Sequence, residues 1–288
     1  MNTVKTTILM ALLTGILVAV GGAFGGRNVA TIMLIISFGI NFFSYWYSDT
    51  IVLKAYDARE VTPTQAPELY SLVENLAANA DLPMPAVYVI QTDAPNAFAT
   101  GRNPSHAAVA VTTGIMRTLN YDELGGVLAH ELSHIKHRDT LISTIAASIA
   151  GVISWIATMA QWAAIFGMGR NNDNEDDNGG ILGMLFTIIV APLAALLIQM
   201  AISRSREYGA DKSGGEICGN PLALAAALEK IEYYAKNAVS MSQATPATAH
   251  MFIINPLTNS KKMMANLFST HPATEDRIAR LKEQAAGR

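Results

Sequence analysis

The chain has 288 residues, of which 51% are hydrophobic and only 15% are charged, and its mean hydropathy is positive. These values lie outside the range of soluble globular proteins and indicate that a good part of the chain lies in lipid. The net charge is −3 and the sequence has no basic stripe, which argues against nucleic acid as a partner. Cys218 is the single cysteine, so an internal disulfide is excluded, and this agrees with a reducing compartment.

Four uncharged apolar runs account for this composition, and each is about long enough to cross a ~30 Å hydrocarbon layer. They cover residues 6–24, 29–47, 141–166 and 181–202. Lys5 before the first run is typical of a signal peptide, but a second full-length run follows a short turn region at residues 25–28 without a convincing cleavage site. The first two runs therefore predict an uncleaved helical hairpin. The last two predict a second hairpin, because their length and lack of charge disfavour core helices of a soluble domain.

Charged residues around these runs predict an orientation. Seven basic residues flank one side of the four spans, whereas the connecting loops hold only Arg27 and Arg170; the seven are Lys5, Lys54, Arg59, Lys136, Arg138, Arg204 and Arg206. By the positive-inside rule, both termini and the charged parts of the chain are predicted to be cytoplasmic. The acidic loop at residues 171–178 is then external, and because it lacks EF-hand spacing it is interpreted as a solvated tip and not as a calcium site.

The soluble part contains elements that the sequence predicts in outline. Residues 67–80 place Leu69, Leu72, Val73 and Leu76 on one helical face, residues 86–91 and 106–112 have the Val-rich composition of strands, and residues 96–100 are a candidate third strand. Asn120 with Glu123 is typical of a capping box at the start of a helix. Further helices are expected at residues 221–236 and 272–284, with loops over the cleft at 239–269.

The motif His130-Glu131-Leu132-Ser133-His134 falls on the helix that follows this capping box. Two histidines four positions apart lie on one helical face about 6 Å apart, so both imidazoles can converge on one Zn²⁺ while Glu131 points toward its water. Zinc lowers the pKa of that water to about 7, and the glutamate removes the proton and later passes it to the leaving amine. The motif therefore predicts a zinc metalloprotease.

A third ligand follows from the positions of the apolar runs. His134 shortly precedes the third run and Glu207 shortly follows the fourth, so an antiparallel helix pair would return Glu207 to the histidines. His₂Glu is an established ligand set for catalytic zinc. Asp211 lies one helical turn beyond Glu207, on the same face, and is the expected acceptor for the remaining N–H of a ligand histidine.

Other histidines compete for this role. His137 lies on the same helical face as His130 but about 10 Å along the axis, which is too far for a shared tetrahedral metal. His106 and His250 have no motif around them. His271 precedes Pro272 and the last expected helix, and a loop histidine at this position is a candidate to swing toward the metal.

These features in this order resemble the HtpX-type membrane metalloproteases of the M48 gluzincin family over essentially the full length. They are two N-terminal spans, Asn96-Ala97-Phe98-Ala99, the His-Glu-Leu-Ser-His motif, a second hairpin, Glu207-Tyr208-Gly209-Ala210-Asp211 and Thr270-His271-Pro272. The resemblance implies one Zn²⁺ per chain, held by His130, His134 and Glu207, with Glu131 as the base. For His271 it implies a donor to the tetrahedral intermediate or a displaceable contact to zinc. It also implies that Asn96, Ala97 and Phe98 belong to an edge strand that pairs with extended substrate, although an ordinary structural strand is an equal alternative.

The expected fold is α+β, a membrane-anchored gluzincin-type metalloprotease domain with about four transmembrane helices. Residues 1–47 and 141–202 would form the two hairpins, and residues 48–140 and 203–288 the two parts of one cytoplasmic protease domain. The resemblance implies an endopeptidase of the bacterial inner membrane, linked to stress, that meets the lipid bilayer and misfolded membrane proteins. A CAAX-type processing metalloprotease and a non-catalytic zinc-binding membrane adaptor are the alternatives; four spans argue against the first, and the intact Glu131 against the second.

Overall fold

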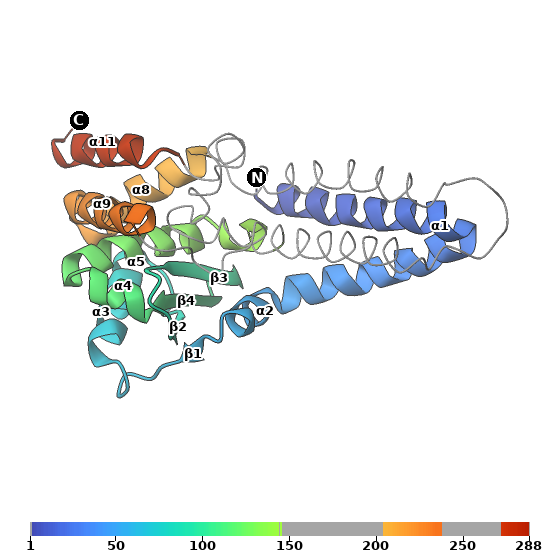
Figure 1. Cartoon of the computed structure of the whole chain (residues 1–288), viewed down its shortest axis with the longest axis horizontal. Helices are drawn as coiled ribbons and strands as arrows, with labels where there is room; N and C mark the ends of the chain where they lie inside the picture. The colour runs from blue at the N-terminus through green and yellow to red at the C-terminus, as the bar shows by residue number, and fades with distance from the viewer. Residues whose placement is uncertain (1, 144, 146–203, 238–271, 288) are drawn as a thin grey trace.

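The computed structural model describes residues 2–143, 145, 204–237 and 272–287, and these form a long helical part and a mixed part with a sheet (Figure 1). The long part is α1 (Asn2–Trp46), which is broken at Gly25 and Gly26. Gly26 has a φ of 62° and a ψ of −158°, a conformation that glycine adopts at little cost. The side-chain amide of Asn41 donates to Thr14 Oγ1 at 3.0 Å, so the two halves of α1 run back along one another. The break lies in the turn region that the sequence predicts.

One of the four expected spans is found at full length among the described residues. Among the described residues, one helix is long and apolar enough to cross a membrane, the 22 residues Gly25–Trp46. The apolar helix Thr6–Ala19 is shorter than a full span. The expected second hairpin at residues 141–202 lies outside the described residues except at its start, where Ile142 and Ile145 are buried. The prediction of four spans is therefore not confirmed.

Two short elements that the sequence did not predict join α1 to the sheet. They are α2 (Ser48–Ala55) and the two-residue strand β1 (Arg59–Glu60). Val52 and Leu53 of α2 are buried against Phe98 and Ala110 of the sheet. This packing fixes the end of α1 beside the sheet.

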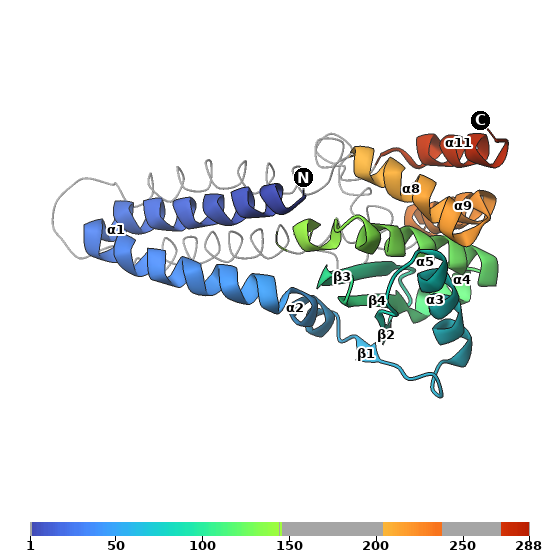
Figure 2. The ribbon, with the colours of Figure 1, turned by 180° about the vertical axis from the view of Figure 1, so that it is seen from behind.

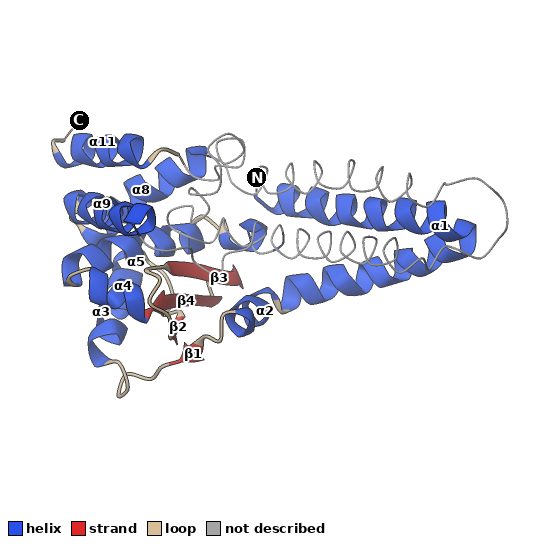
Figure 3. Ribbon diagram, viewed as in Figure 1, coloured by secondary structure: helices blue, strands red, loops and turns tan. Residues whose placement is uncertain are grey.

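The described strands form one four-stranded sheet in the order β1-β2-β4-β3, which lies between α5 on one side and α2 on the other (Figure 3). β2 (Ala86–Ile90) pairs in parallel with β4 (His106–Thr112), and β3 (Ala97–Asn103) pairs antiparallel with β4, with Phe98 opposite Ala110. The central strand β4 is buried from Ala107 to Thr112, as expected for a strand covered on both faces. β3 is an edge strand of this described sheet, which agrees with the candidate third strand.

Helices pack around α5 (Tyr121–Lys136), which carries the zinc motif. The predicted amphipathic helix is α3 (Pro67–Asn79), and it buries the four expected apolar residues. The other helices are α4 (Thr113–Thr118), α8 (Arg204–Cys218), α9 (Pro221–Asn237) and α11 (Thr274–Ala285). One hydrophobic core contains Leu128 and Leu132 of α5 together with Leu224 of α9 and Leu281 of α11. Residues from both sides of the second expected hairpin thus share a core, and the domain boundaries themselves stay a prediction.

Candidate metal centre

The helix that carries the motif begins where the sequence predicts. Asn120 Oδ1 accepts from the Glu123 N–H and the Glu123 carboxylate accepts from the Asn120 N–H, both at 2.9 Å, which is the predicted capping box. Lys230 of α9 donates to the same Glu123 carboxylate at 2.7 Å and ties the start of α5 to its neighbour. The first half of α5 packs on the core, and its second half places His130, Glu131 and His134 between β3 and α8.

Three side chains meet at one point as the sequence predicts. His130 Nε2 and His134 Nε2 are 3.2 Å apart, and the Glu207 carboxylate lies 3.7 Å from the first and 3.5 Å from the second. One ligand atom from each residue lies within 4.8 Å of the others. A tetrahedral zinc ion with bonds of about 2.1 Å separates its ligand atoms by roughly 3.4 Å. The observed separations therefore fit a single tetrahedral cation.

The electrostatics of this group also favour a cation. Burial lowers the pKa of His134, but the hydrogen bond to Asp139 and the nearby Glu207 and Glu131 carboxylates outweigh burial and raise this pKa to about 9. The surrounding carboxylates thus stabilise a positive charge beside the two ring nitrogens. Two histidines and a carboxylate are also the donor types that zinc prefers.

His130 is oriented by a buried chain of charged groups. Its Nδ1 lies 3.0 Å from Asp211 Oδ1, a distance that fits the acceptor role predicted for Asp211. Arg277 of α11 binds the same carboxylate through two atoms, Nε at 2.8 Å and Nη2 at 2.7 Å. Burial raises the pKa of Asp211, but the guanidinium outweighs this effect and holds that pKa well below its usual range. The Asp211 carboxylate holds the His130 ring with its Nε2 atom toward His134 and Glu207.

Sequence reasoning missed two residues of this shell. Arg277 is only 1% exposed, and the available signal was a cation within the apolar stripe of α11, next to Ile278. Asp139 lies just past the end of α5, with its carboxylate 3.3 Å from His134 Nδ1, and the signal was an acid five positions after the second histidine. Arg206 Nε lies 4.0 Å from Asp139 on the other side.

Glu131 is placed between this group and the edge of the sheet. Burial raises its pKa above the usual range, even though the neighbouring His130 and His134 lower it. The backbone N–H of Ala99, on β3, donates to Glu131 Oε2 at 2.9 Å. A buried carboxylate with a raised pKa is a better proton acceptor than an exposed one, and the strand holds it in a fixed orientation.

The remaining predicted site residues take different positions. Asn96 pairs with β4, since its N–H donates to Thr112 Oγ1 and its carbonyl accepts from the Thr112 N–H, both at 2.9 Å. The Phe98 ring packs on Tyr56 with 5.5 Å between ring centroids, on the α2 side of the sheet, so any substrate contact there falls to the backbone. Ala97 is buried on the edge strand. His271 lies outside the described residues, and His137 bonds to the Ser133 carbonyl at 2.9 Å, apart from the three-residue group.

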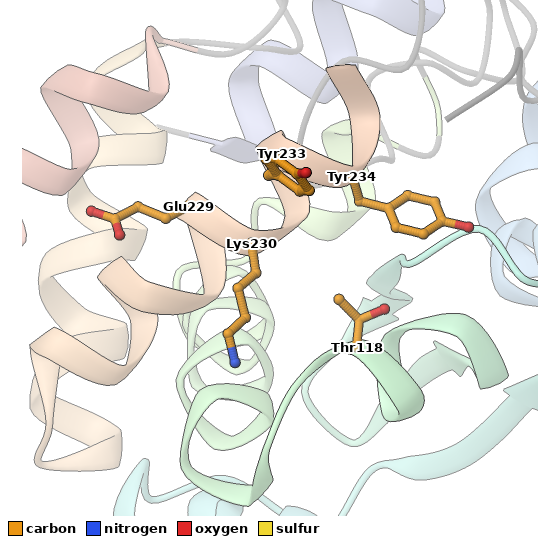
Figure 4. Close-up of a pocket in the computed structure, with 5 residues that line it drawn as sticks. All are labelled: Thr118, Glu229, Lys230, Tyr233 and Tyr234. Carbon is orange, nitrogen blue, oxygen red and sulfur yellow. The ribbon is translucent and has the colours of Figure 1, made fainter. Parts of the chain in front are cut away.

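A separate hollow of about 300 Å³ lies between α4 and α9 (Figure 4). It is lined by Thr118, Glu229, Lys230, Tyr233 and Tyr234. None of these residues belongs to the three-residue group, and Lys230 is already paired with Glu123. The hollow is therefore separate from the candidate metal site on α5 and α8.

Comparisons with known proteins agree with this site. The model for peptidase family M48 matches residues 63–285. The chain is 56% identical to a protease HtpX homolog of Desulfatibacillum aliphaticivorans, over 97% of this chain and 89% of the relative. A protease HtpX homolog of Thermodesulfovibrio yellowstonii is also 56% identical, over 99% of both chains. The crystal structure of S. mikatae Ste24p is similar in fold, with a TM-score of 0.54 and 17% identity over 97% of this chain and 65% of that one.

Proposed function

Because the chain belongs to the M48 metalloproteases and is similar over its whole length to HtpX homologs, we propose that it is a zinc-dependent endopeptidase of the inner membrane. We propose that it cleaves misfolded or damaged membrane proteins at the cytoplasmic face. The observation that carries this proposal is the convergence of His130, His134 and Glu207 within 4.8 Å, with Glu131 beside them.

In this proposal His130, His134 and Glu207 would hold one zinc ion. When bound, zinc supplies a Lewis acid and lowers the pKa of water to about 7. Glu131 takes the proton of the attacking water and returns it to the leaving amine, while the Ala99 N–H keeps its carboxylate in place. Asp211 and Asp139 fix the rings of His130 and His134 through their Nδ1 atoms.

The proposed substrate-binding element is the edge of β3. In an antiparallel pair, residues alternate between bonding to the partner strand and pointing outward. Asn96 bonds to Thr112 of β4, and Ala99 points its N–H outward to Glu131, so the alternation turns the Ala97 backbone outward too. An extended peptide can pair with this edge mainly through backbone groups, which tolerates many side chains and suits quality control.

His271 is proposed as a donor to the tetrahedral intermediate or as a displaceable contact to zinc. This role rests on the family resemblance and on the position of Pro272 and α11, which is anchored at the site by Arg277. A His271→Ala variant with unchanged zinc content and a lower rate would support the first role. Loss of zinc in this variant would support the second.

The proposed location is the inner membrane, in several passes, with the site and both termini in the cytoplasm. Support comes from the span Gly25–Trp46 and from the basic residues on one side of the apolar runs. A cysteine at Asn174 in a Cys218→Ser background should react with a membrane-impermeant maleimide from outside the cell, whereas one at Lys282 should not. The reverse labelling would overturn this orientation.

Proteolysis by the purified protein tests the central proposal. Casein and an unfolded membrane protein should both be cut at internal peptide bonds, and a zinc chelator should stop the reaction. Restoration by added zinc, and not by magnesium, would identify the metal. Cleavage confined to prenylated C-terminal peptides would favour the CAAX-type alternative. Zinc binding with no cleavage of any substrate would favour the adaptor.

A further inference from the structure

One end of the edge strand β3 is attached to the end of the second apolar run and to the residue just before the third. The Arg102 guanidinium lies 4.7 Å from the centre of the Trp46 ring and donates to the Trp46 carbonyl at 3.4 Å. The neighbouring Gly101 carbonyl accepts from Thr140 Oγ1 at 3.0 Å. Trp46 is the last residue of the helix that can span a membrane, and Thr140 directly precedes the third apolar run. The two attachments come from different parts of the chain and mark the same end of the strand.

Aromatic residues place the membrane surface at this level. Phe42, Phe43 and Trp46 at the end of α1, and Tyr47 just after it, are between 45% and 59% exposed. Tryptophan and tyrosine concentrate at the boundary between lipid and water, where their rings sit at the level of the headgroups. If α1 spans the bilayer, the Arg102 end of β3 is therefore expected at the membrane surface.

β3 runs along the long axis of the molecule, with its Asn103 end toward α1, and this is visible from both sides (Figures 1 and 2). A strand in this direction leads away from the membrane and not along its surface. Ala99 is three residues before Arg102, a distance of roughly 10 Å at ~3.3 Å per residue. The Ala99 N–H bonds to Glu131, so the proposed base lies at this same height above the surface.

The height of the strand is fixed by packing. The rings of Phe98 and Tyr56 are in contact at 5.5 Å between centroids, and Val52 and Leu53 of α2 are buried in the same cluster.

The open edge of β3 also ends close to the expected membrane surface. Gly101, with a φ of 127°, lies at an irregularity in the pairing, and its carbonyl is already bound by Thr140.

We propose that the enzyme cuts membrane proteins close to their own spans, at peptide bonds about three to five residues from the membrane surface, the number of extended residues that covers roughly 10 to 17 Å. The substrate is an extended segment that leaves the bilayer and pairs with β3 at once. The products are a span with a short stub and a released cytoplasmic part. This inference rests on the proposed function and specifies its substrate class.

A series of single-span substrates tests the distance. Each carries one identical cleavable segment in a flexible Gly-Ser tail, about 1, 4, 8 or 16 residues from the span, in liposomes that also hold the protease. With a spacer of about 4 residues, we expect a cleavage rate within about threefold of the rate with a spacer of about 16 residues. With a spacer of about 1 residue, the cleavage rate should fall at least tenfold. A requirement for more than about 10 residues, an extended length of about 33 Å, would overturn the inference.

Two comparisons separate this inference from the proposed function. The detergent-solubilised protein should cut the same segment when it carries no span. If it does not, the proposed function fails. If it does, but cleavage in liposomes requires a long spacer, only the proposed distance from the membrane is contradicted. Trp46→Ala removes the ring beneath Arg102, and Phe38→Ala on the same helix is the matched control. The quantity to compare is the ratio of the cleavage rate of the short-spacer substrate to that of the free segment. This ratio should be lower in Trp46→Ala than in Phe38→Ala. An equal ratio in both variants would refute the role of this attachment.

Discussion

Gly214 of α8 is the position where one added methyl group tests the geometry of the metal centre. A Cβ at this position would lie 2.9 Å from both the Cα and the N of His130. Ordinary contacts of this kind are 3.4–4 Å, so Gly214→Ala must push α8 and α5 apart by about 0.5 to 1 Å. The absence of a side chain at Gly214 therefore allows the two helices that carry the proposed ligands to approach this closely.

The displacement matters because Glu207 and Asp211 lie on the same helix and on the same face as Gly214. Glu207 is seven residues, or about 10 Å, before it. Metal–ligand distances tolerate only about 0.2 Å, so the helix shift cannot be absorbed at the metal without strain. Overpacking costs about 1–3 kcal/mol, which corresponds to a roughly 5- to 150-fold loss of zinc affinity if the strain is released when the metal leaves.

Gly209→Ala is the matched control. It adds the same methyl group to the same helix, where nothing lies within 4 Å, and it should stabilise α8 by up to about 1 kcal/mol. Zinc affinity is measured for both variants by competition with a chelator, together with the thermal unfolding of the zinc-free proteins. Equal zinc affinities for the Gly214 and Gly209 variants would refute the close approach of α8 to His130.

Substitutions at four further residues test the roles of single groups. Glu131→Gln should lower the rate by about 10²- to 10⁴-fold with zinc content unchanged, because Glu131 acts on the water and not on the metal; stoichiometric zinc loss would contradict that role. Glu207→Ala should remove both zinc and activity, while Asp211→Ala should weaken each by about 10- to 100-fold; normal turnover in Glu207→Ala would give the ligand role to another residue. Arg277→Ala should destabilise the fold by about 3–5 kcal/mol, because the buried Asp211 carboxylate loses its guanidinium partner and keeps only its contact with His130. Arg277→Met with unchanged zinc affinity would exclude an effect on His130.

Local signals made much of the fold predictable from the sequence. The capping box at Asn120 and the apolar spacing of Leu69 to Leu76 depend on residues three or four positions apart, and both predictions are confirmed. The position of Glu207 was a longer-range inference from the order of the motif and the apolar runs, and Glu207 does lie beside the two histidines, while its role as a ligand stays a prediction. The short elements α2 and β1 lack such signals, since eight and two residues are too few for a period to emerge.

Partners far apart in the sequence were not predictable. Arg277 and Asp211 are separated by 66 positions; Arg277 falls in the apolar stripe of α11, but nothing in the sequence identifies Asp211 as its partner. The bond from the Ala99 N–H to Glu131 involves a backbone group, which leaves no trace in residue type. The prediction that Asn96, Ala97 and Phe98 pair with substrate stays a prediction. The direction of the Phe98 side chain, which packs on Tyr56, depends on the register of β3 and could not be predicted.

The bonds within the site connect separate segments of the chain. Glu207 and Asp211 of α8 reach His130 of α5, Arg277 of α11 reaches Asp211, and Ala99 of β3 reaches Glu131. A buried ion pair such as that of Arg277 and Asp211 adds little net stability over apolar residues of the same volume. Its value here lies in the fixed orientation that it gives to His130, which an apolar pair would not provide. Because the proposed ligands come from both sides of residues 141–202, metal binding would also favour the docked arrangement of α5 and α8 over any separated one.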